Sequence, residues 1–109
     1  ASIGGQWGGT RQTHYAASKA GIMSLTRSLA RLYAAEGITV NAVSPGLVDT
    51  EMVAQELRSD EGQAKVAAIP AKRIARVEEI VAVVTFLASD EASYITGQTV
   101  SVNGGMFCV

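Results

Sequence analysis

Large hydrophobic residues recur with a helical period along the first third of the chain. They stand three or four positions apart, which places them as a continuous apolar stripe on one face of a helix. The residues of this stripe are Ile22, Leu25, Leu29 and Leu32. The pattern predicts a helix that begins at Thr13, His14 or a neighbouring residue. Gly37 is predicted to end it, because glycine adopts the left-handed conformation of a helix C-cap without a steric penalty.

Two short stretches rich in β-branched residues predict strands. Residues 38–43, bounded by a glycine and a proline, are typical of a buried parallel strand, which the Ser-Pro-Gly sequence at 44–46 is expected to end. Residues 98–102 are predicted as the last strand. An Asn-Gly-Gly turn at 103–105 and an apolar tail at 106–109 follow it.

Between these strands the pattern changes twice. Residues 51–72 are polar with scattered apolar positions, which is typical of a mobile lid over a substrate site. Residues 76–88 show a helical period again, and Ser89-Asp90 is expected to end it. The positions predicted to face inward are Val77, Ile80, Val81, Val84, Leu87 and Ala88. The order helix, strand, lid, helix, strand is the alternation of a parallel α/β sheet.

Composition narrows the classes of partner. The 109 residues are 48% hydrophobic and 17% charged, which is ordinary for a globular domain. Nine basic and ten acidic residues are dispersed without a run of like charge, so nucleic acid and anionic membranes are poor candidate partners. The lone Cys108 cannot form an internal disulfide, and the apolar run at 80–88 is too short to span a membrane. A cytoplasmic location is the default expectation.

The candidate chemistry lies at the start of the first predicted helix. Tyr15 and Lys19 are four residues apart, so a helix places them on one face with Cβ atoms about 5–6 Å apart. A tyrosine titrates near ~10, and acid–base work near neutrality requires a pKa about 3 units lower, or roughly 4 kcal/mol. One positive charge about 4 Å away supplies about 4 kcal/mol at an effective dielectric constant near ~20. The pair is therefore sufficient in principle.

Alternatives remain open for this segment. Tyr15 and Lys19 also fit an ordinary helix start, in which the tyrosine packs and the lysine is solvated. Ser2 lies thirteen residues before Tyr15 across a glycine-rich connector, so its hydroxyl can fold back beside the phenol. Within the connector, Gln6 and Trp7 fit a pocket wall or a surface turn equally well. Its glycines lack the Gly-x-Gly-x-x-Gly spacing of a phosphate-binding loop.

Together these residues resemble the short-chain dehydrogenases/reductases, in which Ser, Tyr and Lys at this spacing form the catalytic set. The resemblance covers essentially the whole chain and looks strongest for the bacterial 3-oxoacyl-[acyl-carrier-protein] reductases. Besides Ser2, the matching blocks are residues 15–21, 37–46 with Thr50, 86–90, and 96–97 followed by 102–105. The implied fold is α/β, the C-terminal half of a Rossmann-type doubly wound parallel sheet in three α/β/α layers. The dinucleotide-binding half of that single domain would precede residue 1.

The resemblance also implies a role for each of three side chains. The implied reaction is hydride transfer from NAD(P)H to the ketone carbon of a 3-oxoacyl thioester. Tyr15 would donate a proton to the ketone oxygen, and Ser2 would hydrogen-bond that oxygen. Lys19 would lower the pKa of Tyr15 and bind the hydroxyls of the nicotinamide ribose.

The loop after the first strand is expected to contact the cofactor, because ligands of open α/β sheets lie beyond the carboxyl ends of strands. In the family this segment holds the nicotinamide carboxamide. The matching groups here are the backbone of Val48 and the hydroxyl of Thr50, with Pro45 and Gly46 leading into them. The alternative is a plain strand-to-helix turn capped by Asp49 or Thr50.

Cofactor and substrate follow from the resemblance. It implies NADP or NAD, with NADPH favoured, no metal, and a small carbonyl substrate of the kind that a carrier protein or CoA can carry. Carrier-protein reductases often have a basic residue immediately before the glycine that matches Gly37, and this chain has Glu36 there, which argues against carrier delivery. Two other classes also fit. One is a short-chain dehydrogenase for a sugar, steroid or small alcohol, and the other is an inactive half-domain that oligomerises.

A homo-oligomer, a tetramer as in the family, is expected for two reasons. Small residues on the first predicted helix allow another helix to approach closely. The apolar tail at 106–109 would otherwise leave an aromatic side chain exposed at a terminus. The small residues are Ala16, Ala17, Ala20, Gly21 and Ser24.

Overall fold

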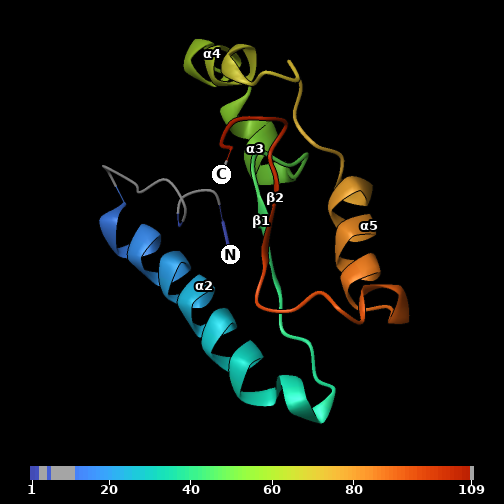
Figure 1. Ribbon diagram of the computed structural model, residues 1–109. Helices are drawn as coiled ribbons and strands as arrows, with labels where there is room; N and C mark the ends of the chain where they lie inside the picture. Colours follow the sequence, from blue (N-terminus) through green and yellow to red (C-terminus); the bar gives the residue numbers. More distant parts are fainter. Residues whose placement is uncertain (3–4, 6–11, 109) are drawn as a thin grey trace.

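The computed structural model describes residues 1–2, 5 and 12–108 (Figure 1). Gln6, Trp7 and most of the predicted glycine-rich connector lie outside these residues, as does Val109. The described elements are α2 (Thr13–Tyr33), the 3₁₀ turn η1 (Ala34–Glu36), β1 (Ala42–Pro45), α3 (Glu51–Glu56), α4 (Asp60–Ala68), α5 (Val77–Leu87), the 3₁₀ turn η2 (Asp90–Ala92) and β2 (Thr99–Val102). No helix among them is long and apolar enough to cross a membrane.

The two strands form a parallel pair at the centre of the molecule. Residues 42–45 of β1 are in register with residues 99–102 of β2. Figure 1 shows α2 on one side of this pair and α5 on the other. Val43 lines a groove with α5, while Ala42 and Ser44, which point the other way, are buried. The predicted α/β class, with helices on both faces of a parallel sheet, is confirmed.

The ends of α2 follow the predicted signals. The helix starts at Thr13, and η1 continues the chain after Tyr33. Gly37 then takes a left-handed conformation with φ 78° and donates its N–H to the Ala34 carbonyl at 3.1 Å. The predicted glycine cap is confirmed, although it closes the 3₁₀ turn rather than the α-helix itself.

The buried side of α2 is not its apolar stripe. Leu25 and Leu32 of the stripe are 56% and 68% exposed. The buried residues of the helix are Ala16, Thr26 and Ala30. Their small size lets the helix lie close to the rest of the chain, since a Cβ on Gly97 would come within 3.3 Å of the Ala30 Cβ. Thr26 tolerates burial because its hydroxyl donates to the carbonyl one turn earlier at 2.7 Å.

Both strands differ in extent from the prediction: β1 is Ala42–Pro45 rather than residues 38–43, and β2 is Thr99–Val102 rather than residues 98–102. Where the hydrogen-bond ladder between the strands was expected to start, two backbone N–H groups donate to side-chain oxygens instead. The Val40 N–H donates to Thr96 Oγ1 at 3.0 Å, and the Gln98 N–H donates to Asn41 Oδ1 at 3.1 Å. The regular pairing therefore begins only after these contacts, and it extends through Pro45.

Most of the apolar positions of α5 are exposed. Val77, Val81 and Val84 are 46%, 54% and 50% exposed, Ala88 is also exposed, and Ile80 and Leu87 are half-buried. The C-terminal part of α5 lies next to β1, where Val84, Leu87 and Ala88 line a groove together with Val43. The inward orientation predicted for Val77 and Val81 is therefore wrong for the chain as described.

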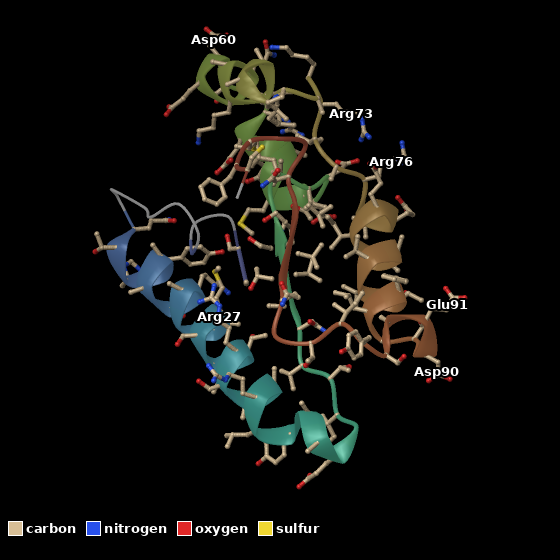
Figure 2. The ribbon with its side chains drawn as sticks, in the orientation of Figure 1. Arg27, Asp60, Arg73, Arg76, Asp90 and Glu91 are labelled. Carbon is tan, nitrogen blue, oxygen red and sulfur yellow. The ribbon has the colours of Figure 1, made fainter. Side chains whose placement is uncertain are left out.

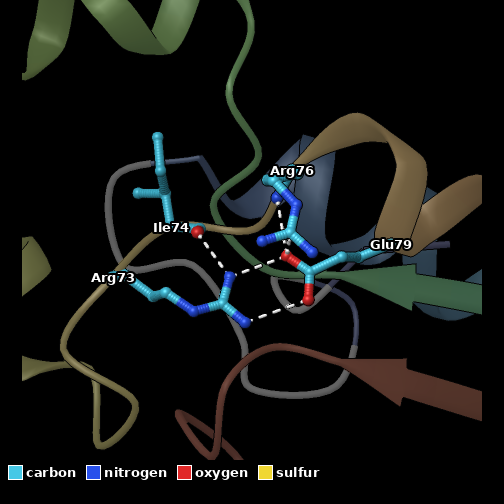
Figure 3. A network of polar contacts seen from close by, with 4 residues as sticks. All are labelled: Arg73, Ile74, Arg76 and Glu79. Carbon is cyan, nitrogen blue, oxygen red and sulfur yellow. Dashed lines mark hydrogen bonds and ion pairs between the residues drawn. The ribbon is translucent and has the colours of Figure 1, made fainter.

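A charged network fixes the start of α5 (Figure 3). Glu79 accepts from the Arg76 backbone N–H at 3.0 Å, which caps the helix. Its two carboxylate oxygens also accept from the Arg73 guanidinium at 2.6 and 2.9 Å. The Arg73 hydrogen bonds, followed by the Arg76 backbone bond, lower the pKa of Glu79 to about 2.

The segment predicted as an irregular lid contains two short helices, α3 and α4. Thr50 and Ser59 precede them, and their hydroxyl oxygens accept from backbone N–H groups at 3.4 and 3.0 Å. After α4, Lys72 has a left-handed backbone with φ 60°, and its ammonium donates to the Ala67 carbonyl at 2.7 Å. The polar pattern therefore corresponds to capped helices, and the mobility of the segment stays a prediction.

Candidate active site

Tyr15 and Lys19 lie together on the first turns of α2. The Lys19 Nζ atom is 5.2 Å from the centroid of the Tyr15 ring, which is a cation–π distance. Tyr15 is 41% exposed, whereas Lys19 is half-buried. This is the reverse of an ordinary helix start in which the tyrosine packs and the lysine is solvated. The phenol is accessible to a ligand, and an ammonium lies beside its ring.

The segment that carries Ser2 folds back along Lys19. The Ser2 carbonyl accepts from the Gly5 N–H at 2.9 Å, and Gly5 lies against the backbone of α2 at Lys19 and Ala20. A Cβ on Gly5 would lie 2.7 Å from the Lys19 carbonyl carbon, so this close approach requires glycine. Gly5, three residues after Ser2, therefore lies against the backbone of Lys19.

The loop after β1 is held against the turn that follows β2. Pro45 ends β1, and the Gly46 N–H donates to the Val102 carbonyl at 3.0 Å. A Cβ on Gly46 would lie 3.0 Å from the Cα of Asn103. Any larger residue at this position would require the backbone of the neighbouring turn to shift.

Val48 directs its backbone groups away from Ala75. The two residues form an isolated parallel bridge, in which Ala75 N donates to Leu47 O at 2.9 Å and Asp49 N donates to Ala75 O at 2.8 Å. Bonds of this kind flank the bridged residue, so the N–H and C=O of Val48 itself point to the opposite side. They offer one donor and one acceptor, which is what a primary carboxamide requires.

Thr50 is the N-cap of α3. Its Oγ1 atom accepts from the Val53 N–H at 3.4 Å. The capped strand-to-helix turn considered for this segment is therefore present. A hydroxyl that accepts one hydrogen bond still has its proton to donate, and Thr50 is exposed, so capping and ligand binding are compatible.

The Tyr–Lys pair and this loop share one end of the sheet. Figure 1 shows the start of α2 and the carboxyl end of β1 towards the same end of the strand pair. Ligands of open α/β sheets bind outside the carboxyl ends of the strands. The structure thus brings the predicted catalytic pair and the predicted cofactor loop to the place where this architecture binds ligands.

Asn103 is a supporting residue that the sequence interpretation did not single out. Its side-chain amide donates to the Phe107 carbonyl at 2.9 Å, and its Oδ1 accepts from the Gly105 N–H at 3.0 Å. Because Asn103 also packs against Gly46, it supports both the tail and the predicted cofactor loop. The sequence held a signal for it, since an asparagine before two glycines is typical of a turn closed by its own side chain.

The distribution of charge is a second feature that was missed. The first 35 residues contain no Asp or Glu, so α2 carries Lys19, Arg27 and Arg31 without a compensating acid. A search for runs of like charge does not detect this uneven distribution, because the basic residues of α2 are separated by uncharged ones. The helix that holds the Tyr–Lys pair is cationic along its length, which favours anionic ligands. Within the described residues, no group of three His, Cys, Asp or Glu side chains is placed to hold a metal ion.

Comparison with known proteins identifies the family. A family model described as enoyl-(acyl carrier protein) reductase matches residues 1–107. The chain belongs to the short-chain dehydrogenase/reductase family. The crystal structure of a short-chain dehydrogenase/reductase from Brucella melitensis, titled glucose/ribitol dehydrogenase, matches with a TM-score of 0.90 and 37% identity. That match covers 100% of this chain and 44% of the other.

Several curated members of the short-chain dehydrogenase/reductase family are more similar in sequence. The chain is 49% identical to the 3-oxoacyl-[acyl-carrier-protein] reductase FabG of Salmonella typhimurium over 108 residues, and 51% identical to that of Pseudomonas aeruginosa over 106. It is 47% identical over 108 residues to the acetoacetyl-CoA reductase of Shinella zoogloeoides. These matches cover 99%, 97% and 99% of this chain, and 44%, 42% and 45% of the relatives. The chain therefore spans less than half the length of the relatives it matches.

Proposed function

We propose that residues 1–109 form the C-terminal, catalytic part of a single NAD(P)-binding Rossmann domain in a carbonyl reductase. The proposed reaction is the reduction of a 3-oxoacyl thioester to the 3-hydroxyacyl thioester. The observation that carries the proposal is the Lys19 ammonium over the exposed Tyr15 ring, with the segment of Ser2 folded against Lys19. Relatives named as 3-oxoacyl-[acyl-carrier-protein] and acetoacetyl-CoA reductases supply the substrate class.

Each of the three side chains has a step that its chemistry fits. The nicotinamide cofactor, when bound, supplies the hydride that the carbonyl carbon accepts. Tyr15 donates its phenolic proton to the carbonyl oxygen as negative charge develops there. The Ser2 hydroxyl donates a hydrogen bond to the same oxygen and polarises it. The Lys19 ammonium stabilises the phenolate left on Tyr15, and its further protons can reach ribose hydroxyls.

The loop after β1 fits the nicotinamide end of the cofactor. The Val48 N–H and C=O match the acceptor and donor of a carboxamide, and the Thr50 hydroxyl has a proton to donate beside them. The close contact of Gly46 with Asn103 sets the position of this loop. We expect NADPH rather than NADH on the family resemblance.

Glu36 bears on the form of the thioester. It is exposed on η1, where carrier-protein reductases often have a basic residue. A carboxylate there repels an acidic carrier protein instead of attracting it. A CoA-bound or free thioester is therefore the proposed substrate form, and acyl-carrier-protein delivery is the form that Glu36 disfavours.

The proposed protein is a homo-oligomer, a tetramer on the pattern of the family. Leu25 and Leu32 on α2 and Val81 on α5 are more than half exposed, and exposed apolar side chains of this size gather at subunit interfaces. We also propose a cytoplasmic location, in keeping with a sequence whose single cysteine, Cys108, cannot form an internal disulfide.

A sugar-alcohol dehydrogenase is the second candidate, because the matching Brucella structure is titled glucose/ribitol dehydrogenase. Assays of the whole protein with acetoacetyl-CoA, crotonyl-CoA, ribitol and glucose distinguish the thioester reductase from the sugar-alcohol dehydrogenase. Oxidation of NADPH by acetoacetyl-CoA is the expected result. Faster cofactor reduction by ribitol or glucose would support the second candidate. Cofactor binding without turnover of any of the four would point to a non-catalytic, oligomerising protein.

A further inference from the structure

The connector between α4 and α5, residues 69–76, contacts two parts of the molecule that belong to the candidate site. Near its start, the Ala71 N–H donates to the Gly104 carbonyl at 3.0 Å. Near its end, Ala75 forms the parallel bridge with Val48. The connector is therefore bonded both to the turn after β2 and to the proposed cofactor loop.

The backbone of Ala75 holds the loop after β1 by both of its polar groups. Its N–H donates to the Leu47 carbonyl at 2.9 Å, and its carbonyl accepts from the Asp49 N–H at 2.8 Å. These two bonds turn the N–H and C=O of Val48 to the opposite side, where the cofactor carboxamide is proposed to bind. Because the methyl side chain of Ala75 makes no polar contact, the direction of its peptide groups depends on what holds the neighbouring residues.

One carboxylate, that of Glu79, holds the chain on both sides of Ala75 (Figure 3). On the N-terminal side, the Arg73 guanidinium donates to the two Glu79 oxygens at 2.6 and 2.9 Å. The same guanidinium donates to the Ile74 carbonyl at 3.3 Å. On the C-terminal side, the Arg76 N–H donates to Glu79 Oε1 at 3.0 Å. Side-chain bonds thus close the chain between Arg73 and Glu79 into a ring, and Ala75 lies within it.

The ion pair lies next to the loop as well as next to Ala75. Figure 2 shows Arg73 on the connector, where the chain passes from α4 to α5. Arg73 and Glu79 line a small cavity of about 110 Å³, and its other lining residues include Leu47, Ala75 and Asn103. Leu47 belongs to the loop after β1, and Asn103 belongs to the turn after β2. The pair therefore shares a cavity with the parts of the chain that hold the proposed cofactor site.

We infer that Arg73 and Glu79 are positioning residues for the nicotinamide end of the cofactor. Their ion pair fixes the direction of the Ala75 peptide groups, and these direct the N–H and C=O of Val48 towards the cofactor carboxamide. The inference rests on the proposed function, because that proposal assigns the loop after β1 to a nicotinamide cofactor. Partly exposed ion pairs contribute little even with two parallel hydrogen bonds, so the expected effects are severalfold.

Hydrogen–deuterium exchange of the whole protein, measured by mass spectrometry, tests the positioning step without a cofactor. The peptides that contain Asp49 and Ala75 report on the bridge, because the N–H groups of both residues are hydrogen-bonded in it. Arg73→Gln should raise the exchange rate of these two groups about twofold to fivefold, the factor that an exposed ion pair contributes. The peptide of Ala42 is the internal control, since its N–H donates to the Gln98 carbonyl in the strand pair, and its rate should not change.

Matched variants assign the effect to this ion pair. Arg76→Gln removes the neighbouring guanidinium, whose Nε is 3.9 Å from the Glu79 carboxylate, and should raise the exchange rates less than Arg73→Gln does. Glu78→Gln should not change them, because Glu78 forms no ion pair in the part of the chain that the structure describes. Arg73→Lys keeps the charge and loses the two-pronged contact, so its rates should be intermediate. The double variant Arg73→Gln, Glu79→Gln should exchange no faster than Glu79→Gln alone, because both substitutions remove the same contact.

Steady-state kinetics of the whole protein test the connection to the cofactor. Arg73→Gln should raise the KM for NADPH about twofold to fivefold and leave kcat with acetoacetyl-CoA within about twofold of the wild type. A merely structural role would give the opposite pattern. Loss of folded enzyme lowers the apparent kcat and leaves the KM unchanged.

Three results would overturn the inference. One is unchanged exchange at Asp49 and Ala75 in Arg73→Gln, which would exclude the positioning role whether or not the protein binds a cofactor. Another is faster exchange with an unchanged KM for NADPH, which would show that the bridge does not serve the cofactor. The third is an equal effect of Arg73→Gln and Arg76→Gln, which would indicate a general charge effect. A wild-type protein that does not bind NADPH would instead refute the proposed function, and the exchange rates would still decide whether the pair positions Val48.

Discussion

The turn after β2 and the outer faces of α2 and α5 differ in how far the chain itself supplies their contacts. The polar groups of the turn have hydrogen-bond partners within the chain, whereas the apolar side chains of the outer faces are exposed. In the turn, one side chain, Asn103, accepts from Gly105 and donates to Phe107, and its backbone fits against Gly46. On the outer faces, Leu32 of α2 is 68% exposed and Val81 of α5 is 54% exposed. The end of the sheet that carries the candidate site is thus organised by residues of this chain, whereas α2 and α5 present apolar surface that nothing in the described chain covers.

This difference suggests separate roles for the two regions: the turn positions the candidate site, and the outer helix faces contact another polypeptide segment. Contacts within the described chain position the loop after β1 and the Tyr15–Lys19 pair, so the proposed chemistry depends on residues that this chain supplies. Large exposed apolar side chains are typical of surfaces that another polypeptide segment covers. We therefore expect variants of the turn and of the pair to change activity, and variants of the outer faces to change association.

The largest effect is expected when the proposed catalytic pair, Tyr15 and Lys19, is broken. Tyr15→Phe removes the phenolic proton and should lower kcat with acetoacetyl-CoA by about 10²–10⁴-fold while the protein stays folded. Tyr33→Phe is the matched control, because Tyr33 also lies on α2 and is also 41% exposed. Steady-state rates of the whole protein check this, and equal turnover of the two variants would exclude Tyr15 from the mechanism.

Substitution of Asn103, which packs against the proposed cofactor loop, is expected to have the next largest effect. Asn103→Ala removes both side-chain hydrogen bonds and should lower the free energy of unfolding by about 1–3 kcal/mol, measured by urea denaturation. It should also raise the KM for the cofactor, because the turn whose backbone packs against Gly46 is no longer held by these two hydrogen bonds.

Asn103→Asp tests the donor separately. It keeps the acceptor for the Gly105 N–H but places a carboxylate oxygen without a proton against the Phe107 carbonyl, so it should be less stable than the wild type at neutral pH and recover part of the difference when the carboxyl is protonated. If Asn103→Ala unfolds at the same urea concentration as the wild type, the turn does not support the loop.

The outer face of α2 should affect assembly more than stability. Leu32→Lys places a charge on the exposed apolar face and should reduce the mass of the oligomer in light scattering, to about half for a tetramer built from dimers. Gln63→Lys adds the same charge at an exposed position of α4 and should leave the mass unchanged. An unchanged mass in both variants would remove this face from the subunit interface.

The smallest effect concerns acid stability at the start of α5. The pKa of Glu79 is lowered to about 2, from an ordinary value of 4.5, chiefly by Arg73. A lowered pKa in the folded state stabilises the protein above the unfolded value, and this stability is lost as the pH falls through the folded value. Glu79→Gln should therefore be slightly less stable than the wild type at neutral pH, with the difference vanishing near pH 2.

Glu78→Gln is the control, since Glu78 is the adjacent exposed carboxylate and forms no ion pair among the described residues. Thermal unfolding at several pH values compares the two variants. A Glu79→Gln difference that persists unchanged at pH 2 would exclude the proposed ionic origin.

Local spacing predicted the features that depend on neighbouring residues. The start of α2, the left-handed Gly37 and the shared face of Tyr15 and Lys19 all follow from residues within a few positions of one another. The limits of β1 did not follow, because the contact between Asn41 and Gln98 joins residues 57 positions apart. Strand propensity contains no information on such a contact.

Burial and the supporting residues were harder to predict for the same reason. Of the five small residues of α2 that were expected to meet another helix, only Ala16 is buried. The periodic stripe faces outward, because the side of the helix that packs depends on the shape of the sheet beneath it. Asn103 was missed because its importance depends on a residue far along the chain, Gly46.

Titration of NADPH into the purified 109-residue chain by calorimetry tests most directly whether these residues form the catalytic half of a larger dinucleotide-binding domain. Dinucleotide affinity in this fold depends on the first βα turn, where the pyrophosphate meets a helix N-terminus. We expect that turn to lie in the other half of the domain, so the chain alone should show no measurable binding and no reductase activity. Addition of the other half should restore some of both. Tight NADPH binding by the 109-residue chain alone would contradict the half-domain proposal.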